Sequence, residues 1–480
     1  MIQLQLNKRD FEYDIYSLIK SFYPGRDVTV TYGTEDGTDA GLKISVFYEE
    51  NQITISMFDG ERELLRRETA AADLEGNRKE AKSVMGRLAY RMLREVTGRE
   101  LPWGDLTGVR PTKIPMSLLE QGWKNSDIAR YMRETYFTSK EKTALAIMIA
   151  NRERHILKAL NYENGYSLYV GIPFCPSICL YCSFSSSPLK VWKNRVDDYL
   201  DALCREIDAA AEIFAGRELN TVYVGGGTPT TLEPGQMDRL LAKLEERFDY
   251  SRLLEFTVEA GRPDSITREK LQVLRDHHIT RISINPQTMN QSTLDLIGRK
   301  HTVEQTVEAF HLAREMGFDN INMDLIVGLP GEGMAEVEHT MEEIRKLDPD
   351  SVTVHSLALK RAARLNLFKD EYQDISFQNS SEIMDMTAAS CERAGLAPYY
   401  LYRQKNMAGN FENVGYAREG KAGIYNILIM EEVQSILALG AGASTKVVCG
   451  DRIERIENVK DIKSYIERID EMIERKKRIE

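Results

Sequence analysis

The chain has 480 residues, of which 42% are hydrophobic and 29% are charged, a composition typical of globular proteins. A chain of this length usually exceeds one hydrophobic core, so we expect two or three domains. The net charge of −11, from 63 basic and 74 acidic residues, argues against a nucleic-acid partner, because phosphate binding depends on an excess of Lys and Arg.

Several features indicate a cytoplasmic protein without a membrane partner. No apolar run approaches the roughly 20 residues that cross a bilayer. The first residues, Met1 to Leu4, alternate like a strand and lack the basic region of a signal peptide. Six cysteines are few for a chain of this length, which argues against a disulfide framework.

Residues 1–160 are expected to form an α+β and helical domain without assignable chemistry. Four strands and one helix are predicted in its first part, at Met1–Leu6, Val28–Tyr32, Leu42–Phe47, Gln52–Met57 and Asp10–Phe22. From Ala70 to Leu160 the apolar residues recur at helical spacing, interrupted by a turn-rich stretch at Trp103–Pro111. This pattern favours packing or docking over catalysis.

From residue 161 to 365, short β-branched runs alternate with helical segments. Six strands are predicted at Ser167–Ile172, Thr221–Val224, Glu255–Glu259, Arg281–Ile284, Ile321–Ile326 and Ser351–Val354. Helices are predicted near 192–216, 235–248, 267–277, 290–298, 302–316 and 333–346. Strict alternation of this kind predicts a parallel sheet with helical crossovers, and ligands of such sheets gather at the carboxyl ends of the strands.

One of these predicted helices has well-defined ends. Thr302 and Gln305 form a capping box at its start, and Gly317 stands where a left-handed C-terminal residue is needed.

Three cysteines follow the first of these strands: Cys175, Cys179 and Cys182, at the spacing C-x3-C-x2-C. Three thiolates on one loop can hold three corners of an iron–sulfur cube and leave the fourth iron open, as a catalytic site requires. Structural zinc is the alternative. Zinc takes four ligands, however, and the other three cysteines are scattered singly. The spacing therefore favours an iron–sulfur cluster.

Distinctive residues also follow the other predicted strands. The run Gly225–Thr230 follows the second strand and lets the backbone approach a ligand closely. The third strand ends in Glu259, the fourth leads to Gln287, and the fifth contains Asp324. Each of these alone is compatible with a cap or a satisfied core group. Their common position at one edge of the sheet favours a polar ligand site.

Together these motifs, from about Tyr166 to Lys446, resemble the oxygen-independent coproporphyrinogen III oxidase family of the radical S-adenosylmethionine (SAM) superfamily, most closely its HemZ-type members. The resemblance implies an α/β fold. A partial (β/α)6 barrel at 161–365 follows an N-terminal α+β domain at 1–160 and precedes a small C-terminal α/β lid domain at 366–480. It also implies a [4Fe–4S] cluster on the three cysteines, and one or two SAM molecules.

The resemblance further assigns contacts to individual residues. Those to the SAM bound at the cluster are Tyr169, Gly226, Glu259 and Ala358, and those to a second SAM are Tyr181, Gly227, Thr228, Gln287, Arg299 and Asp324.

The implied reaction belongs to haem biosynthesis. A radical derived from SAM takes a hydrogen atom from a propionate side chain of coproporphyrinogen III. The propionate then loses CO2 and one electron to leave a vinyl group, and two such conversions give protoporphyrinogen IX. The catalytic chemistry thus belongs to the cofactors. The implied partners are the tetrapyrrole and an electron donor such as flavodoxin or ferredoxin, and the chain is expected to be a monomer.

Propionates need cationic partners, which the segment Lys360–Arg364 could supply, although a basic run is more often a solvated surface. Tyr399–Lys405 and Ile436–Ser444 resemble the family's lid region, and a strand and turn in a domain core is the alternative for both. A single final helix is predicted from Ile462, Ile466, Ile469 and Ile473.

A rival function is that of the HemW haem chaperones, which share the barrel and the glycine run. Those relatives typically carry a His-Asn pair followed by Tyr-Trp, whereas this chain reads Glu412-Asn413-Val414-Gly415-Tyr416-Ala417. The missing His and Trp disfavour the chaperone. A radical enzyme acting on another tetrapyrrole is the third possibility.

Overall fold

The structure is a computed structural model that describes residues 1–33, 41–49, 51–59, 63–160, 162, 164–358, 379–404, 411–450 and 452–478. It divides into two compact units: unit 1 is Met1–Asn151 with Tyr402–Glu412, and unit 2 is Arg152–Leu401 with Asn413–Glu480. The domain boundaries at 160/161 and 365/366 stay predictions, and the second lies outside the described residues. Within the described ranges, no helix is long and apolar enough to cross a membrane.

Unit 1 contains a five-stranded sheet in the order β2-β1-β3-β4-β5. The strands are β1 (Ile2–Leu6), β2 (Val28–Tyr32), β3 (Leu42–Glu49), β4 (Gln52–Asp59) and β5 (Glu63–Ala71). β1 runs parallel to β2 and β3, and β3, β4 and β5 pair antiparallel. The first four strands lie where the sequence predicts them. β5 was not predicted, because its sequence ELLRRETAA is rich in helix-forming residues, and pairing with β4 overrides that propensity.

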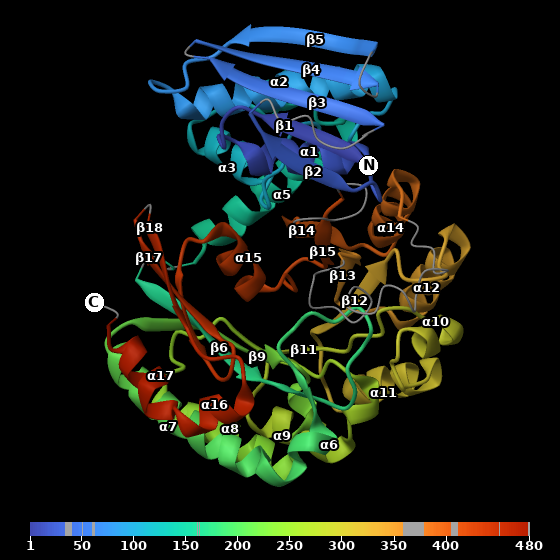
Figure 1. The fold of residues 1–480 in the computed structure, drawn as a ribbon. Coiled ribbons are helices and arrows are strands. Elements are labelled where there is room, and N and C mark those ends of the chain that lie inside the picture. The colour runs from blue at the N-terminus through green and yellow to red at the C-terminus, as the bar shows by residue number, and fades with distance from the viewer. Residues whose placement is uncertain are drawn as a thin grey trace. The chain divides into compact units, whose positions relative to one another are not determined.

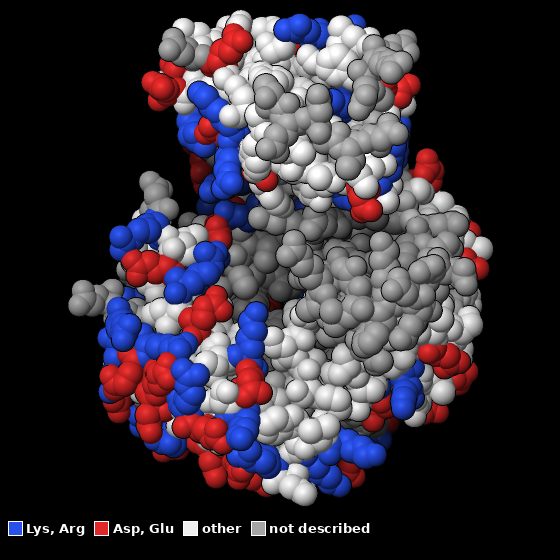
Figure 2. Space-filling view, viewed as in Figure 1, with Lys and Arg blue, Asp and Glu red and all other residues white. Residues whose placement is uncertain are grey.

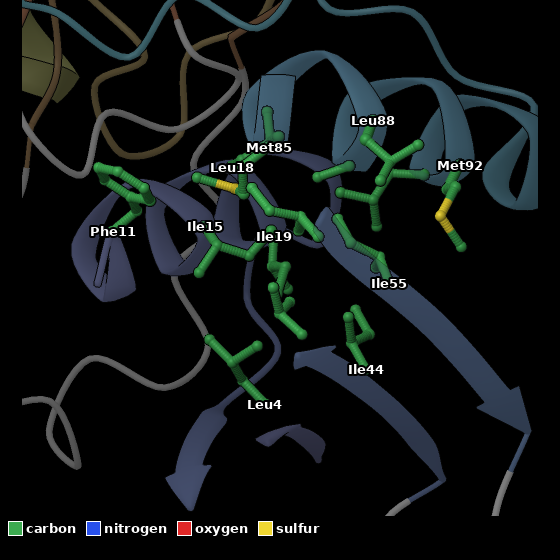
Figure 3. Packing of buried hydrophobic residues seen from close by; sticks show 14 of the residues in the cluster. Leu4, Phe11, Ile15, Leu18, Ile19, Ile44, Ile55, Met85, Leu88 and Met92 are labelled. Carbon is green, nitrogen blue, oxygen red and sulfur yellow. The ribbon is translucent and has the colours of Figure 1, made fainter. Parts of the chain in front are cut away.

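Helices supply the rest of unit 1: α1 (Glu12–Phe22), α2 (Arg78–Thr97), α3 (Lys113–Glu120), α4 (Asn125–Tyr136) and the first part of α5 (Lys140–Lys158). Figure 3 shows apolar side chains of α1 and α2 meeting those of the sheet. Ile19 of α1, Met85 of α2 and Ile44 of β3 are each at most 1% exposed. The helical periodicity therefore correctly indicated the face that is buried.

The segment Tyr402–Glu412 belongs to unit 1 although its neighbours in sequence belong to unit 2. Its carboxyl end is held by a buried carboxylate: Glu412 accepts a hydrogen bond from Trp103 Nε1 at 2.7 Å, and Lys142 Nζ lies 2.8 Å from its other oxygen. Arg403 donates through its backbone amide to the Val109 carbonyl at 2.7 Å. The turn-rich stretch at Trp103–Pro111 is thus a packing element.

Unit 2 is built on six parallel strands in the order of the sequence: β6 (Gly165–Ile172), β9 (Glu218–Gly226), β10 (Glu255–Glu259), β11 (Arg281–Ser283), β12 (Ile321–Val327) and β13 (Ser351–Ser356). Figure 1 shows the connecting helices on the outer side of this curved sheet. They are α7 (Val196–Ile213), α8 (Pro234–Arg247), α9 (Arg268–Asp276), α10 (Gln291–Leu296), α11 (Val303–Glu315) and α12 (Met334–Leu347). The predicted partial (β/α)6 barrel is confirmed.

Further strands extend the sheet at both edges, and it does not close on itself within the described residues. β15 (Asn413–Ala417) pairs antiparallel with β13 and has β14 (Ala397–Tyr402) as its other neighbour. β16 (Ser435–Leu439) pairs in parallel with β6, and the hairpin β17 (Ser444–Cys449) and β18 (Arg452–Glu457) follows it. The remaining elements are β7 (Phe174–Cys175), β8 (Ser187–Pro188), α6 (Leu189–Trp192), α14 (Ser381–Arg393), α15 (Ile424–Glu431), α16 (Ile462–Glu467) and α17 (Ile469–Lys476).

The predicted ends of α11 are also confirmed. The Thr302 side chain accepts from the Gln305 amide at 3.2 Å, and the Gln305 side chain accepts from the Thr302 amide at 2.9 Å. Gly317 follows the helix with φ +86°, a value that only glycine adopts without strain. The capping box fixes where the preceding loop ends, and that loop carries Arg299.

The single final helix predicted from residue 462 onward is wrong. The chain forms α16 and α17, separated at Arg468, whose φ of −116° and ψ of 27° are not helical. The break brings Tyr465 and Lys476 to one buried carboxylate on α7, that of Glu206. Lys476 Nζ lies 2.6 Å from Glu206 Oε1, and these side chains are 1% and 0% exposed. Ile466 and Ile473, expected on the packing face, are only partly buried.

Charges on the outer helices of unit 2 are interleaved. Figure 2 shows basic and acidic side chains alternating over the region of α7, α8 and α17. Ion pairs there join Arg205 to Asp470 and Arg239 to Asp201, and Lys243 lies 2.8 Å from Asp208. This face therefore offers a mixed surface, of the kind that keeps a protein in solution.

Replacing Lys476 by Met should destabilise unit 2, because the substitution leaves the Glu206 carboxylate buried without its cation. We expect a loss of about 3 kcal/mol, typical of a broken buried ion pair, measured by chemical denaturation. Lys477→Met is the matched control. Its ion pair with Glu474 is exposed, so it should change stability by less than about 0.5 kcal/mol. Equal effects of the two substitutions would contradict a buried ion pair at Glu206.

Candidate functional site

The three cysteines lie on the loop that follows the first barrel strand, β6. The loop is folded back on itself, because β7 and β8 pair in parallel and join Cys175 to Pro188. The Cys182 amide donates to the Cys179 carbonyl at 3.1 Å, which makes a tight turn between those two residues. Short-range geometry thus keeps all three thiols on one compact loop at the carboxyl end of β6.

Loops from other strands hold this one in place. The Gly227 amide, after β9, donates to the Ile172 carbonyl at 2.7 Å, and the Leu180 amide donates to the Ile297 carbonyl at 3.0 Å. Arg262, after β10, donates to the Ser177 hydroxyl at 2.9 Å while its guanidinium pairs with Asp264 at 2.7 Å. The cysteine loop is therefore bound to the loops after β9 and β10 and to the end of α10.

The environment of the thiols combines burial with hydrogen-bond donors. Burial raises the pKa of Cys175 and of Cys182, and negative charge on the neighbouring thiols adds to the shift. The Thr228 hydroxyl lies 3.6 Å from Cys175 Sγ, and Arg299 Nη1 lies 3.9 Å from Cys179 Sγ. The Thr228 hydrogen bond opposes the rise in the pKa of Cys175 and so favours its thiolate, which is the form that binds metal.

Among the described residues, no three His, Cys, Asp or Glu side chains converge as the ligands of a single metal ion do. The ligands of an iron–sulfur cube sit on separate irons. The assignment of the three thiols as cluster ligands stays a prediction, with which the donor set on this loop is compatible.

Arg299 contacts two of the residues that the sequence singled out, Cys179 and Tyr181. It is 5% exposed, and its Nη1 donates to the Tyr181 hydroxyl at 3.2 Å as well as approaching Cys179. Its Nη2 donates to the Asn285 carbonyl at 2.5 Å. A guanidinium in this position places positive charge at the cysteine loop and anchors Tyr181, which is part of that loop.

Unpaired polar atoms lie on two residues after the fourth strand and on Arg299, whose Nη2 donates to the Asn285 carbonyl. Gln287 Oε1, Asn285 Oδ1 and Arg299 Nε are buried and have no hydrogen-bond partner within the described part of the chain. Buried polar atoms without partners are rare, because each costs free energy unless a ligand or water satisfies it. These atoms fit a polar ligand.

Gln287 also has a strained backbone, with φ +70°, in the left-handed region that a non-glycine residue seldom occupies. Its amide donates to the Asp324 carbonyl at 3.0 Å, and its carbonyl accepts from the Ile326 amide at 2.9 Å. These two bonds from β12 hold the strained residue, and strain of this kind concentrates at functional sites. Gln287 and Asp324 are therefore joined through the backbone.

Glu259, at the end of β10, is the main carboxylate of the site. Burial raises its pKa to about 7, and the nearby Asp324 charge adds to this, whereas hydrogen bonds from the Tyr223 hydroxyl and the Gly226 amide oppose it. A Cβ at Gly225 would lie 3.1 Å from Glu259 Cδ, and one at Gly226 would lie 3.3 Å from the Tyr169 hydroxyl. The glycines thus let Tyr169, Gly226 and Glu259 come together.

Asp324 on β12 is held in the charged form. Its burial favours the neutral acid, but His355, with Nε2 3.8 Å from Oδ2, and Asn322, which donates to Oδ1 at 2.7 Å, lower its pKa below the ordinary value. The pKa of Asp324 is therefore lowered, whereas the pKa of Glu259 is raised, although the two carboxylates lie near each other.

Accessibility along the strands identifies the interior surface. Tyr169, Tyr223, Glu259, Asp324 and His355 each keep part of their surface accessible, whereas the residues directly before and after each of them along the strand are buried. Side chains alternate between the two faces of a strand. These five therefore point to a common, accessible interior of the curved sheet.

The predicted site residues thus form four contacting groups: Cys175 with Gly227 and Thr228, Cys179 with Cys182, Tyr181 and Arg299, Tyr169 with Gly226 and Glu259, and Gln287 with Asp324. Ala358 follows β13 by two residues, at the same end of the sheet, and no described contact joins it to the others. Lys360–Arg364 and Lys405 lie outside the described residues.

The proposed lid aromatics are core residues instead. Tyr399 and Tyr400 lie in β14 and are 0% and 5% exposed, because β14 is a strand of the main sheet. Ile436–Leu439 likewise lies within β16, beside β6. Sequence reasoning missed Tyr223, Arg262 and His355. Tyr223 could have been found from its position two residues before Gly225, on the same face of the strand.

The chain is similar in sequence and fold to known proteins. The sequence profile of the radical SAM superfamily matches residues 169–344. The chain is 39% identical over 472 residues to the oxygen-independent coproporphyrinogen-III oxidase-like protein HemZ of Bacillus subtilis, which covers 96% of this chain and 94% of that protein. It is 32% identical to the heme chaperone HemW of the same organism, over 64% of this chain and 76% of the chaperone.

Among solved structures, the coproporphyrinogen III oxidase HemN of Escherichia coli, described as a radical SAM enzyme, matches with a TM-score of 0.53 at 27% identity. The match covers 67% of this chain and 73% of that one. Fold and sequence together define a radical SAM protein, a class whose members use a [4Fe–4S] cluster and SAM. More narrowly, the chain belongs to the HemZ-type group of oxygen-independent coproporphyrinogen-III oxidase-like proteins.

Gly227→Ala should impair assembly of the cysteine loop. The added Cβ would lie 2.6 Å from the Phe174 carbonyl oxygen and 3.0 Å from Cys175 Sγ, so the backbone carrying Cys175 must shift. We expect at least a threefold loss of iron and sulfide per chain after anaerobic reconstitution. Gly235→Ala on α8 meets no atom within 4 Å and should keep wild-type iron. Full iron content in Gly227→Ala would show that the glycine is dispensable.

Proposed function

We propose that this protein is an oxygen-independent coproporphyrinogen III dehydrogenase, a radical SAM enzyme that decarboxylates two propionates to give protoporphyrinogen IX. The observation that carries the proposal is the loop of three thiols beside Glu259 and the glycine run, in a chain similar over nearly its full length to a coproporphyrinogen-III oxidase-like protein. The E. coli coproporphyrinogen III oxidase is 29% identical over 74% of this chain.

In this proposal Cys175, Cys179 and Cys182 hold the cluster. When bound, the cluster and SAM supply one-electron, hydrogen-abstracting chemistry. Residues of the chain bind and orient: SAM at the cluster contacts Tyr169, Gly226, Glu259 and Ala358. If a second SAM binds, it contacts Tyr181, Gly227, Thr228, Gln287, Arg299 and Asp324. The unpaired oxygen of Gln287 and unpaired Nε of Arg299, within the described residues, support a polar ligand beside them.

Glu259 has the properties needed to bind a cofactor ammonium group. It is accessible from the interior, and as a carboxylate it accepts charge-assisted hydrogen bonds. Its pKa of about 7 means that a bound cation would favour its ionised form, so binding and ionisation strengthen each other. Arg299, buried beside Cys179, supplies positive charge at the cysteine loop. The buried strands would exclude water from the site, and this exclusion would protect a radical.

The haem chaperone is the second candidate, favoured by the similarity to HemW. Against it stands Glu412, at the position where those relatives carry a His. Its carboxylate is 1% exposed and already engages Trp103 and Lys142, so it offers no free ligand for a haem iron. Titration with haem tests this directly. A Soret shift without product formation would favour the chaperone.

The proposal also covers the electron donor, the oligomeric state, the cellular compartment and the partners. A flavodoxin or ferredoxin would supply the electron, the chain would act as a monomer in the cytoplasm, and neither nucleic acid nor membrane would take part. The interleaved charges over α7, α8 and α17 support this reading of the surface.

Activity is tested with anaerobically reconstituted protein, coproporphyrinogen III, SAM and a reductant, with porphyrin products separated after oxidation. We expect protoporphyrin and SAM cleavage from wild type, and a loss of at least a hundredfold in Cys179→Ala, which removes a cluster ligand. Cys204→Ala is the matched control. Cys204 lies on α7, away from the loop, so this variant should keep activity. Fully loaded wild type that forms no vinyl product would refute the assignment.

A further inference from the structure

Helix α15 is docked against the barrel strands by an acid from one of them. Glu255, at the start of β10, accepts hydrogen bonds from the amides of Ile424 at 2.7 Å and Tyr425 at 3.3 Å. The residue preceding the helix is Gly423, which has no side chain to cap it. The strand therefore caps the helix. Figure 1 shows α15 on the inner side of the curved sheet, opposite the connecting helices.

The docked helix carries one ring of an aromatic stack. Tyr425 stacks on Tyr223 of β9, with ring centroids 4.5 Å apart and planes 22° apart. Tyr223 in turn faces Tyr169 of β6, at 6.2 Å and 15°. Three nearly parallel rings thus run from α15 to the interior residue Tyr169, and stacked rings of this kind restrict one another's rotation.

Tyr223 connects the stack to Glu259. Its hydroxyl donates to Glu259 Oε1, and burial, together with the Glu259 charge, raises the pKa of Tyr223 well above its ordinary value. The phenol therefore keeps its proton and acts as a permanent donor. One carboxylate oxygen is fixed by this bond, so the direction of the other is set by the position of the Tyr223 ring.

We propose that Tyr223 and Tyr425 are positioning residues for SAM binding: Tyr223 orients the Glu259 carboxylate toward the cofactor's ammonium group, and Tyr425, anchored through Glu255, holds the Tyr223 ring. This inference rests on the proposed function and extends it to residues outside the predicted contacts. It also gives α15 a role, as the support beneath the cofactor site.

The inference has a pH signature. Glu259 faces the hydroxyl of Tyr223 on β9, the Asp324 carboxylate on β12, His355 on β13, and the phenols of Tyr169 and Tyr425. Burial raises the pKa of Glu259 to about 7, and the Tyr223 bond lowers it. Removing that bond raises the pKa further. As the pH is lowered, Glu259 then becomes protonated at a higher pH than in wild type. SAM affinity should fall at that same higher pH.

The experiment measures SAM binding by equilibrium dialysis, on cluster-loaded, unreduced protein, between pH 6 and pH 9. We expect Tyr223→Phe to weaken binding about tenfold at pH 7 and to move the pH midpoint upward by about one unit, as expected for loss of a hydrogen bond to a charged group. Glu259→Gln should bind weakly without a pH step in this range. A merely structural tyrosine would lower stability without moving the midpoint.

Two comparisons isolate the stack. Tyr425→Leu removes the supporting ring and should weaken binding several-fold, whereas Tyr425→Phe keeps the ring and should bind like wild type. Tyr250→Phe is the matched control, because the Tyr250 hydroxyl is buried without a partner in the described residues, and it should also bind like wild type. Iron content and melting temperature are measured for each variant, to exclude misfolding.

The outcomes separate the two levels of the argument. If wild type binds SAM and Tyr223→Phe shows the same affinity and midpoint, the positioning role is wrong and the proposed function stands. If Tyr425→Leu also binds like wild type, the role of α15 is wrong as well. If loaded wild type does not bind SAM, the proposed function fails and this inference fails with it.

Discussion

Two backbone hydrogen bonds join the loops that follow the first two barrel strands. The Gly227 amide donates to the Ile172 carbonyl and the Thr228 amide to the Phe174 carbonyl, each at 2.7 Å. Because these groups belong to the backbone, their geometry depends on how closely the two loops approach, and only residues without a side chain at 226 and 227 permit that approach. The position of Cys175 relative to Thr228, and hence of the thiol loop relative to the sheet, depends on this pair.

The charged groups of the site differ in their environments. Glu259 has a raised pKa because it is buried with another acid nearby, and Asp324 a lowered one because His355 and Asn322 attend it. Arg299 places positive charge at the cysteine loop. Acidic groups on strands β10 and β12 and the cationic Arg299 therefore occupy separate positions, which is an arrangement that can orient a polar ligand as well as attract it.

Much of this fold could be predicted because its signals are local. Each of the six barrel strands lies where β-branched runs indicated, and the capping box of Thr302 and Gln305 is present. The misses have non-local causes. β5 is a strand because β4 pairs with it, against its own propensity. The C-terminal helix breaks at Arg468, where the segment turns so that both Tyr465 and Lys476 reach Glu206. At the site, the thiol spacing and Glu259 could be read from the sequence. Tyr425 and Arg262 could not, since their roles arise from contacts between distant segments.

The segment Tyr402–Glu412 belongs to unit 1, although it lies far downstream in the sequence. The evolution of the amino-terminal region is therefore coupled to that of this segment. Glu412 is buried only because Trp103 and Lys142 receive its carboxylate, so a chain shortened to begin at Arg152 would expose an acid adapted to a cationic pocket. Gain or loss of the amino-terminal region therefore requires a matching change far downstream. Relatives that lack the amino-terminal region should therefore also differ at the position of Glu412. An exchange of barrels between such relatives must include the segment Tyr402–Glu412.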